Sequence, residues 1–261
     1  MAKSEVGQRT TGQETGTWRG WTAHLPWKRL ALGLCLVVAA PLLAVGLYQA
    51  ATWPDVASLS SRNPETTAFI ERSRARASEA GQPGDVRWHW VPYDRVSPHL
   101  KRAVLVAEDI SFFSHGGFEF AEIKQAIRDA LGGERSLRGA STITQQLAKN
   151  LWLSPSRNPF RKVKEAILTR QLERNLSKKR ILEIYLNVVE FGPGVYGAEA
   201  AARRYFGKPA AELSEEEAAQ LAAGLPRPSR WNPQSDSDWY RSYAAKIEQR
   251  MDRAEFLWRR I

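Results

Sequence analysis

The chain has few of the residues that build covalent cross-links and metal clusters. It has 261 residues and a single cysteine, Cys35, so no internal disulfide can form. The four histidines lie far apart in the sequence and do not suggest a metal cluster; they are His24, His89, His99 and His115. No internal repeat is present, which excludes a repeat array.

Positive charge and tryptophan are what the chain has in excess. The formal net charge is +10 and the isoelectric point is about 9.9, which favours a polyanionic partner. Nucleic acid, anionic lipid headgroups and phosphorylated substrates all qualify. The 10 tryptophans fit a protein that works at a membrane or a sugar surface. With 43% hydrophobic residues, the chain can build one good-sized domain with appendages.

The first 54 residues divide into a polar tail and an uncharged run. Residues 1–29 lack helical or strand periodicity, so a disordered tail is expected. Residues 30–54 carry no charge and are numerous enough to cross a bilayer, which takes about 20 residues. A cleaved signal peptide has a shorter apolar core than this run, although the small residues Ala50 and Ala51 could form a cleavage site. A buried helix of a soluble domain is the other alternative. Because basic residues outnumber acidic ones before the run, one transmembrane helix with a cytoplasmic N-terminus is expected.

The rest of the chain is expected to lie outside the cytoplasm. It would consist of a connecting region at 55–86 and a mainly α-helical domain at 87–261. Thr67 to Ala80 predicts a short basic helix, and the aromatic segment from Arg87 to Tyr93 predicts one strand. Capping residues and apolar periodicity then predict helices at 97–107, 119–131, 141–151, 160–176, 196–206 and 239–258. Two more helices are predicted to start at Ser177 and at Ser214.

Two further predictions concern the start of one helix and the packing of another. Ser141 is the predicted N-cap of the helix that reaches Leu151. In the final helix, one stripe carries Trp239, Tyr243, Ile247, Met251, Ala254 and Trp258. Such a stripe is typical of core packing.

One acidic residue of this domain stands in an unusual setting. The run EDISFFSHGG, residues 108–117, joins a Glu–Asp pair to aromatic residues, a histidine and two glycines. A short helix that ends here would bring Glu108 to the lip of a groove, where the aromatic rings shelter it from water. Partial desolvation raises the pKa of a glutamate from about 4.3 toward neutrality and makes it a better base. The alternative is a capped helix end with a surface acidic pair.

The run GASTITQQLAKN, residues 139–150, predicts a polar helix face. Its hydroxyl, amide and ammonium groups recur three and four residues apart, at Thr142, Gln145, Gln146 and Lys149. Such a face suits hydrogen bonding to a polar ligand such as a sugar. A solvated surface is the alternative.

A basic stretch, SRNPFRKVKE, follows at 156–165. Arg161 and Glu165 are four residues apart on the predicted helix, so a surface ion pair explains them in the simplest way. Alternatively, Lys149, Arg157 and Arg161 form a cationic wall suited to a diphosphate.

Together, five ordered motifs between Trp88 and Pro233 resemble the family 51 peptidoglycan glycosyltransferases. They are EDISFFSHGG, GASTITQQLAKN, RKVKE, RILEIYLNVVEFGPGVYGAEAAARRYFGK and LAAGLPRPSRWNP. The resemblance implies a lysozyme-like helical fold with a head and a membrane-proximal jaw, which polymerises lipid II at the outer face of the bacterial inner membrane. Because the chain stops at Ile261 and contains no Ser-x-x-Lys or Lys-Thr-Gly, the monofunctional members without a transpeptidase domain are the expected match.

The resemblance also implies roles for two acidic residues. Glu108 matches the catalytic base that takes the proton from the 4-hydroxyl of the incoming lipid II sugar. The oxygen then attacks the anomeric carbon of the growing strand, with inversion and departure of the lipid diphosphate. Glu165 matches a second glutamate that acts at the diphosphate, directly or through a divalent cation, Mg²⁺ or Mn²⁺. No organic cofactor is implied.

Other positions match binding and supporting residues of the family. The residues that hold the donor diphosphate would be Lys149, Arg157 and Arg161. The same cleft would be lined by Ser141, Thr142, Gln145 and Gln146. The first motif would be completed by Asp109, Phe112, His115 and Gly117. In the fourth motif, helix packing and turns explain Tyr185, Asn187, Gly192 and Gly197. The candidates for a jaw that dips into lipid are Phe112, Phe113, Phe118, Phe120, Trp152 and Phe160.

Two rival functions stay open. A membrane-bound lytic transglycosylase or muramidase would cut glycan with Glu108 as an acid, although the cationic residues favour a diphosphate-bearing substrate. A non-enzymatic cell-wall scaffold would not need Glu108, and the expected periplasmic location argues against nucleic acid. The expected partners are lipid II, the growing glycan strand, the bacterial inner membrane and proteins of cell-wall synthesis or division.

Overall fold

A computed structural model describes residues 37, 39–41, 43–44, 46–81, 86–119, 141–154 and 159–261. The predicted tail at 1–29, much of the predicted transmembrane segment at 30–54, the predicted helix from 120 onward and Arg157 lie outside these residues. The chain divides into two compact units, Met1–Trp53 and Pro54–Ile261. The described residues of the first unit are helical from 37 to 51. Within the described ranges, no helix is both long enough and apolar enough to cross a membrane.

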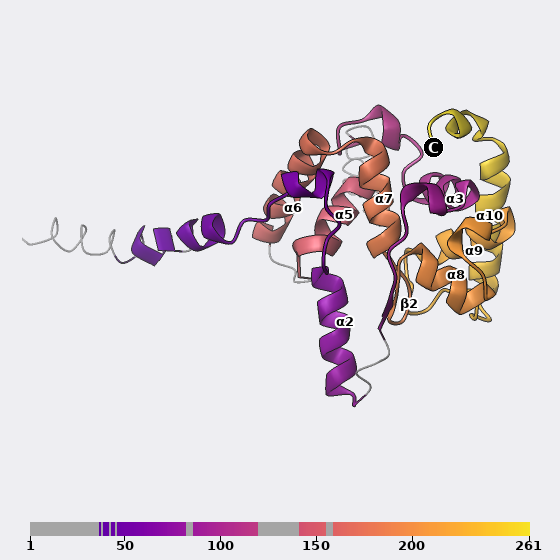
Figure 1. Ribbon diagram of the computed structural model, residues 1–261, viewed down its shortest axis with the longest axis horizontal. Coiled ribbons are helices and arrows are strands. Elements are labelled where there is room, and N and C mark those ends of the chain that lie inside the picture. The colour runs from indigo at the N-terminus through magenta and orange to yellow at the C-terminus, as the bar shows by residue number, and fades with distance from the viewer. Residues whose placement is uncertain are drawn as a thin grey trace, which may run out of the picture. The chain divides into compact units, whose positions relative to one another are not determined.

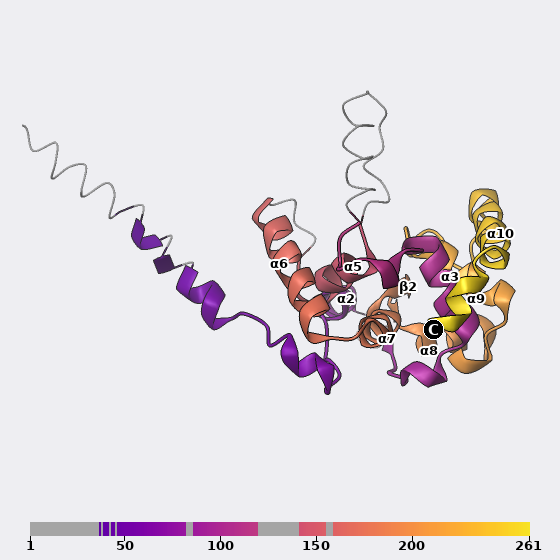
Figure 2. The same ribbon diagram turned by 90° about the horizontal axis from the view of Figure 1, so that it is seen from above.

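The second unit is mainly helical, as predicted, and its helices fall into two groups (Figure 1). In the first group α5 contacts α2, α6 and α7; in the second, α3, α9 and α10 contact one another. The view from above also separates α5, α6 and α7 from α3, α9 and α10 (Figure 2). The helix bounds are α2 (Ala68–Glu79), α3 (Pro98–Glu108), α5 (Ile143–Trp152), α6 (Pro159–Asn175), α7 (Lys178–Val188), α8 (Ala198–Phe206), α9 (Glu215–Gly224) and α10 (Asp238–Asp252). Short 3₁₀ turns are η1 (Ala57–Ser60), η2 (Tyr93–Arg95), η3 (Phe112–Ser114), η4 (Ala210–Glu212) and η5 (Glu255–Arg259).

Several helix starts lie where local capping chemistry predicts them. The side chain of Ser97 accepts a hydrogen bond from the backbone of His99 at the start of α3, and Ser177 caps α7 in the same manner. Ser214 and Glu217 form the predicted capping box of α9. These starts are confirmed because a cap needs only a few neighbouring residues.

Three predictions about helix ends are wrong. Thr142, not Ser141, caps α5, since the Thr142 side chain accepts from the backbone N–H of Gln145. The helix predicted from Tyr196 begins only at Ala198, because Tyr196 belongs to a strand. The final helix stops at Asp252 instead of reaching residue 258.

The apolar stripe of α10 also divides between core and surface. Ile247 and Met251 are fully buried, as predicted, whereas the side chain of Trp239 is 51% exposed. The Trp239 ring stacks on Trp231 of the preceding loop at 3.9 Å between centroids, so it packs outside the core. Trp258 lies beyond the helix, where its ring meets the edge of His99.

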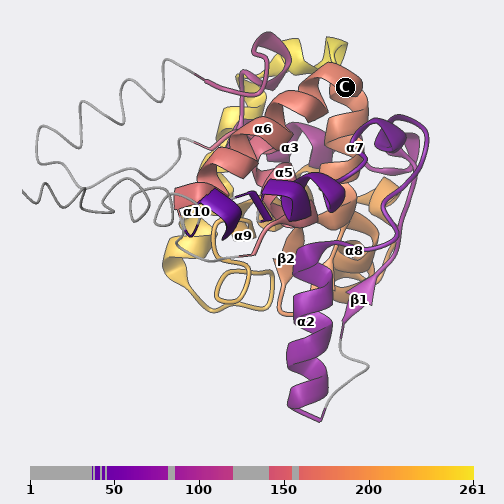
Figure 3. The ribbon, with the colours of Figure 1, turned by 90° about the vertical axis from the view of Figure 1, so that its left-hand side faces the viewer.

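Among the described residues, a small sheet joins distant parts of the chain. Its strand order is β1 (Arg87–Trp88), β3 (Val195–Tyr196) and β2 (Glu190–Gly192), with β1 parallel and β2 antiparallel to β3. Figure 3 shows α2 beside β1, and the Tyr196 hydroxyl donates to the carbonyl of Phe69 in α2 at 3.4 Å. The prediction of a strand over Arg87–Tyr93 is wrong in its length, since β1 contains only two residues at the edge of this sheet.

A buried asparagine explains why the strand ends so soon. The Asn187 side chain is fully buried; its oxygen accepts from the backbone of Val91 at 2.8 Å, and its nitrogen donates to the Val91 carbonyl at 2.9 Å. The same nitrogen donates to the carbonyl of Glu183. The side chain thus satisfies backbone groups that a neighbouring strand would otherwise pair. This supports the interpretation of Asn187 as a packing residue.

Asn187→Ala is expected to lower the free energy of unfolding by about 2 kcal/mol, because it leaves the Val91 groups without these bonds. Urea denaturation in detergent measures the change. The matched control is Asn175→Ala, since Asn175 is exposed and its side-chain nitrogen donates to a nearby carbonyl in the same helix. Equal stability losses in the two variants would contradict the role of Asn187.

Candidate active site

Glu108 stands at the end of α3, where the chain leaves the helix at Asp109. Its carboxylate oxygen Oε2 accepts a hydrogen bond from Nε2 of Gln146 on α5 at 2.7 Å. Burial raises the pKa of Glu108 and the charge of Asp109 adds to this, while the Gln146 bond and the charge of Lys149 oppose it. The structure thus places a desolvated, hydrogen-bonded carboxylate where the sequence predicts one.

The rest of the first motif is tied to the start of α5. Asp109 accepts from the backbone N–H of Ile143 at 3.0 Å and from Nε2 of His115 at 2.9 Å. Nδ1 of His115 accepts from the backbone of Gly117 at 3.0 Å, so the ring proton lies on the nitrogen that faces Asp109. The Thr142 hydroxyl donates to the Gly117 carbonyl at 2.8 Å. These bonds fix the position of Glu108 relative to α5.

The polar residues on α5 divide between capping and the site. Gln145 is buried, and its side-chain oxygen accepts from the backbone of Thr142, completing a capping box. Gln146, one residue later, reaches Glu108. Ser141 is exposed, and its carbonyl accepts from Nε2 of Gln146 at 3.3 Å. Phe112 is fully buried, and its ring lies edge-on to those of Phe113 and His115.

The predicted cations and the second glutamate lie on α5 and α6. Glu165 is buried and forms an ion pair with Lys162. Burial lowers the pKa of Lys149, as do Arg161 and Lys162, whereas Glu165 and Glu108 raise it. Lys149 therefore lies within the electrostatic reach of both glutamates. The buried Nε of Arg161 has no hydrogen-bond partner among the described groups.

Gln146 and Lys149 open onto a cleft of about 660 Å³. Its walls come from α2, α5, β2 and the loop after α9, and its charged side chains are Arg76, Lys149, Glu190, Arg227 and Arg230. Four of these five are cations, so the cleft favours an anionic ligand. Arg227 and Arg230 belong to the fifth sequence motif, whereas Arg76 lies outside the five motifs.

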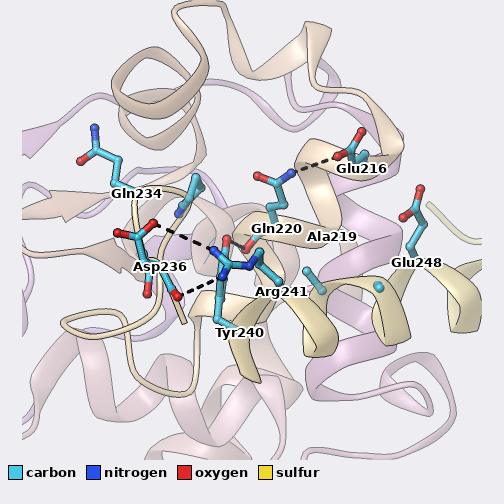
Figure 4. Close-up of a pocket in the computed structure, with 12 residues that line it drawn as sticks. Glu216, Ala219, Gln220, Gln234, Asp236, Tyr240, Arg241 and Glu248 are labelled. Carbon is cyan, nitrogen blue, oxygen red and sulfur yellow. Dashed lines mark hydrogen bonds and ion pairs between the residues drawn. The ribbon is translucent and has the colours of Figure 1, made fainter. Parts of the chain in front are cut away.

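A second cavity, of about 510 Å³, lies between α9 and α10 (Figure 4). Two pairs of its polar side chains interact, Gln220 with Glu216 and Arg241 with Asp236 (Figure 4). None of the predicted site residues that the structure describes lines it. We therefore place the candidate active site at the cleft with Gln146 and Lys149.

Tyr185 is a functional candidate that sequence analysis assigned to packing alone. It is fully buried on α7, and its hydroxyl donates to Oε1 of Gln146 at 3.0 Å. The sequence does carry one sign of this role. Tyr185 is the single polar group on a helix face that otherwise carries Ile181, Leu182 and Leu186, and a buried tyrosine hydroxyl needs a hydrogen-bond partner. The partner lies 39 residues away, which no local pattern specifies.

Comparison with known proteins shows the family to which the chain belongs. Residues 76–254 match the family described as Transglycosylase. The chain belongs to this transglycosylase family. Among its relatives, the biosynthetic peptidoglycan transglycosylase of Azoarcus sp. (strain BH72) is 46% identical over 224 residues, 86% of this chain and 96% of that protein. The protein of the same name from Thiobacillus denitrificans is 47% identical over 205 residues, 78% of this chain and 86% of that protein.

A third relative of that name, from Bordetella pertussis, is 41% identical over 236 residues, which is 89% of this chain and 96% of that protein. The predictions of a peptidoglycan glycosyltransferase, and hence of an enzyme, are confirmed by these matches. The roles of individual residues in this transglycosylase stay predictions.

Proposed function

We propose that this transglycosylase polymerises lipid II into β-1,4-linked glycan strands, with inversion at the anomeric carbon, release of undecaprenyl diphosphate and no transpeptidase activity. One observation carries the proposal. Gln146 holds the desolvated carboxylate of Glu108 at 2.7 Å and lines the same cleft as Lys149. The proposed base is therefore hydrogen-bonded to a residue of the cleft wall, and the charge of Lys149, on the same wall, acts on it.

Glu108 is the group suited to deprotonate the acceptor. A sugar 4-hydroxyl is a weak acid, and its attack is helped when a base takes the proton as the new bond to the anomeric carbon forms. The electron pair of the breaking bond leaves with the diphosphate on the opposite face, which inverts the centre. Because a diphosphate leaves without being protonated, one carboxylate base is enough and no separate acid is needed.

The cations suit the leaving group. Negative charge builds up on the diphosphate as the glycosidic bond breaks, and fixed positive charge in a water-poor site stabilises it. Lys149 and Arg161 supply that charge from α5 and α6, and Arg157 joins them by its match to the family motif. The unpartnered buried Nε of Arg161 is a donor suited to a phosphate oxygen.

A divalent cation, Mg²⁺ or Mn²⁺, is compatible with this arrangement when the substrate provides most of the ligands. In the described part of the chain, no three His, Cys, Asp or Glu side chains gather into a metal site. Magnesium often binds one or two carboxylates together with substrate phosphates. Glu165 supplies one carboxylate and would hold such a cation, which would add positive charge at the diphosphate.

Membrane attachment belongs to the same proposal. A lysozyme-like head and jaw, anchored by a transmembrane helix at 30–54 on the periplasmic side of the inner membrane, would keep the site beside its polyprenyl substrate. The two helical groups of the second unit are compatible with such lobes. Phe160 is 79% exposed at the start of α6 and suits contact with lipid. The growing strand and cell-wall synthesis or division proteins are the proposed partners.

The test gives the purified full-length protein lipid II in one reaction and cell-wall sacculi in another. We expect glycan polymer from lipid II, with β-configured new linkages by NMR, and no soluble muropeptides from sacculi. Muropeptide release without polymer would instead support a lytic enzyme. Neither product would support a scaffold.

The pH dependence of the reaction follows from the state of the base. Burial raises the pKa of Glu108, and the base must be ionised to act. We therefore expect kcat/KM for lipid II to rise with pH through a pKa above that of an exposed glutamate. Rates measured across the acidic range test this. An acidic limb at the ordinary glutamate pKa would contradict the role of burial.

A further inference from the structure

Gln146 connects the proposed base to a buried phenol. Its Nε2 donates to Glu108 at 2.7 Å, and its Oε1 accepts from the Tyr185 hydroxyl at 3.0 Å. The three side chains come from α3, α5 and α7. Both ends of the amide are therefore engaged, one by a carboxylate and the other by a hydroxyl.

Only one of the two amide orientations can donate to a carboxylate. If the amide turned over, Oε1 would face the Glu108 carboxylate and repel it. The Ser141 carbonyl, which accepts from Nε2 at 3.3 Å, opposes this turn because it cannot donate to Oε1. The Tyr185 hydroxyl favours the observed orientation, in which its proton is donated to Oε1. Burial raises the pKa of Tyr185 well above its ordinary value, so the phenol keeps its proton and stays a donor.

We propose that Tyr185 is a positioning residue for glycosyl transfer, because its hydroxyl holds the Gln146 amide in the orientation that donates to Glu108. The proposal rests on the proposed role of Glu108 as the base. Tyr185 acts through Gln146, and its expected effect is on the ionisation and aim of the base. Substrate binding is carried by other groups.

Other charged and titratable groups also face Glu108, and they remain in place when the phenol is changed. Asp109 follows it in the chain, and Lys149 acts on it from α5. The charge of Glu108 also raises the pKa of Tyr243 on α10. Of the causes that act on Glu108, the Gln146 hydrogen bond is the largest that lowers its pKa. Loosening the amide therefore moves the pKa of Glu108 upward.

The experiment compares Tyr185→Phe with the parent across the acidic pH range. We expect the acidic limb of kcat/KM to move to higher pH, with a loss of about 3- to 10-fold on that limb, the size of one hydrogen bond. KM is expected to stay unchanged. The control is Tyr240→Phe, which removes another buried hydroxyl whose bond goes to the Gln220 carbonyl instead.

A double-mutant cycle shows whether Tyr185 acts through Gln146. Gln146→Met removes both bonds at similar volume, so adding Tyr185→Phe to it is expected to cost nothing more. Additive losses, or a uniform fall in kcat with the acidic limb unmoved, would overturn the proposal. If Glu108→Gln is inactive while Tyr185→Phe behaves as the parent, only the positioning role fails. If Glu108→Gln is fully active, the base assignment itself fails.

Discussion

Glu108→Gln is expected to lower kcat for lipid II polymerisation by about 10²–10⁴-fold, the usual contribution of a positioned general base. Glutamine keeps the size of the side chain and an oxygen that can accept from Gln146, so the hydrogen bond at this position is retained. It cannot accept the proton of the sugar hydroxyl. A time course of glycan polymer formation from lipid II measures the loss.

The same variant separates catalysis from folding. Burial raises the pKa of Glu108, so the folded protein holds this proton more tightly than the unfolded chain does. This contribution to stability is therefore present at low pH and lost as pH rises through the raised pKa. Glu108→Gln removes the buried charge, and we expect it to unfold at or above the parent's temperature at neutral pH. Full polymerisation by a well-folded Glu108→Gln protein would falsify the base assignment.

Local chemistry explains which parts of the fold were predictable. The starts of α3, α7 and α9 follow from serine caps within three residues of the helix, so the sequence specifies them directly. The strand at Tyr196 pairs with Arg87–Trp88, more than a hundred residues earlier, and no local pattern contains that pairing. The prediction of core packing for Trp239 is wrong for a related reason, since its partner Trp231 lies in a loop that the helical periodicity does not cover.

The candidate site shows the same division between local and distant information. The motif resemblance singles out Glu108, Gln146 and Lys149. The structure joins Glu108 to Gln146 by a hydrogen bond and places Gln146 and Lys149 on the wall of one cleft. Periodicity alone would place Gln145 on the same ligand-facing side, but the capping box turns its amide back to the backbone. The sequence predicts only packing for Tyr185, because its bond to Gln146 exists only once α5 and α7 are packed together.

Lys149→Ala is expected to lower kcat/KM for lipid II by about 10²–10³-fold, comparable to removing one charge-stabilising donor from a preorganised site. The charges of Glu165 and Glu108 both raise the pKa of Lys149. Its removal therefore takes positive charge from the proposed diphosphate site and from beside the base. Because the charge of Lys149 lowers the pKa of Glu108, the acidic limb of the variant should also move to higher pH.

Inorganic diphosphate gives a direct probe of the binding half of this prediction. It should inhibit the parent competitively and inhibit Lys149→Ala more weakly, because Lys149 is proposed to bind the same group in the substrate. Lys246→Ala, which removes an exposed lysine on α10, controls for the change in net charge and should match the parent. Since mobile ions screen exposed charges more than half-buried ones, the difference between the two variants should persist as salt is raised to about 0.15 M. Unchanged kinetics and unchanged inhibition in Lys149→Ala would mean that the diphosphate binds away from Lys149, and the other cations of the cleft, Arg76, Arg227 and Arg230, would be tested next.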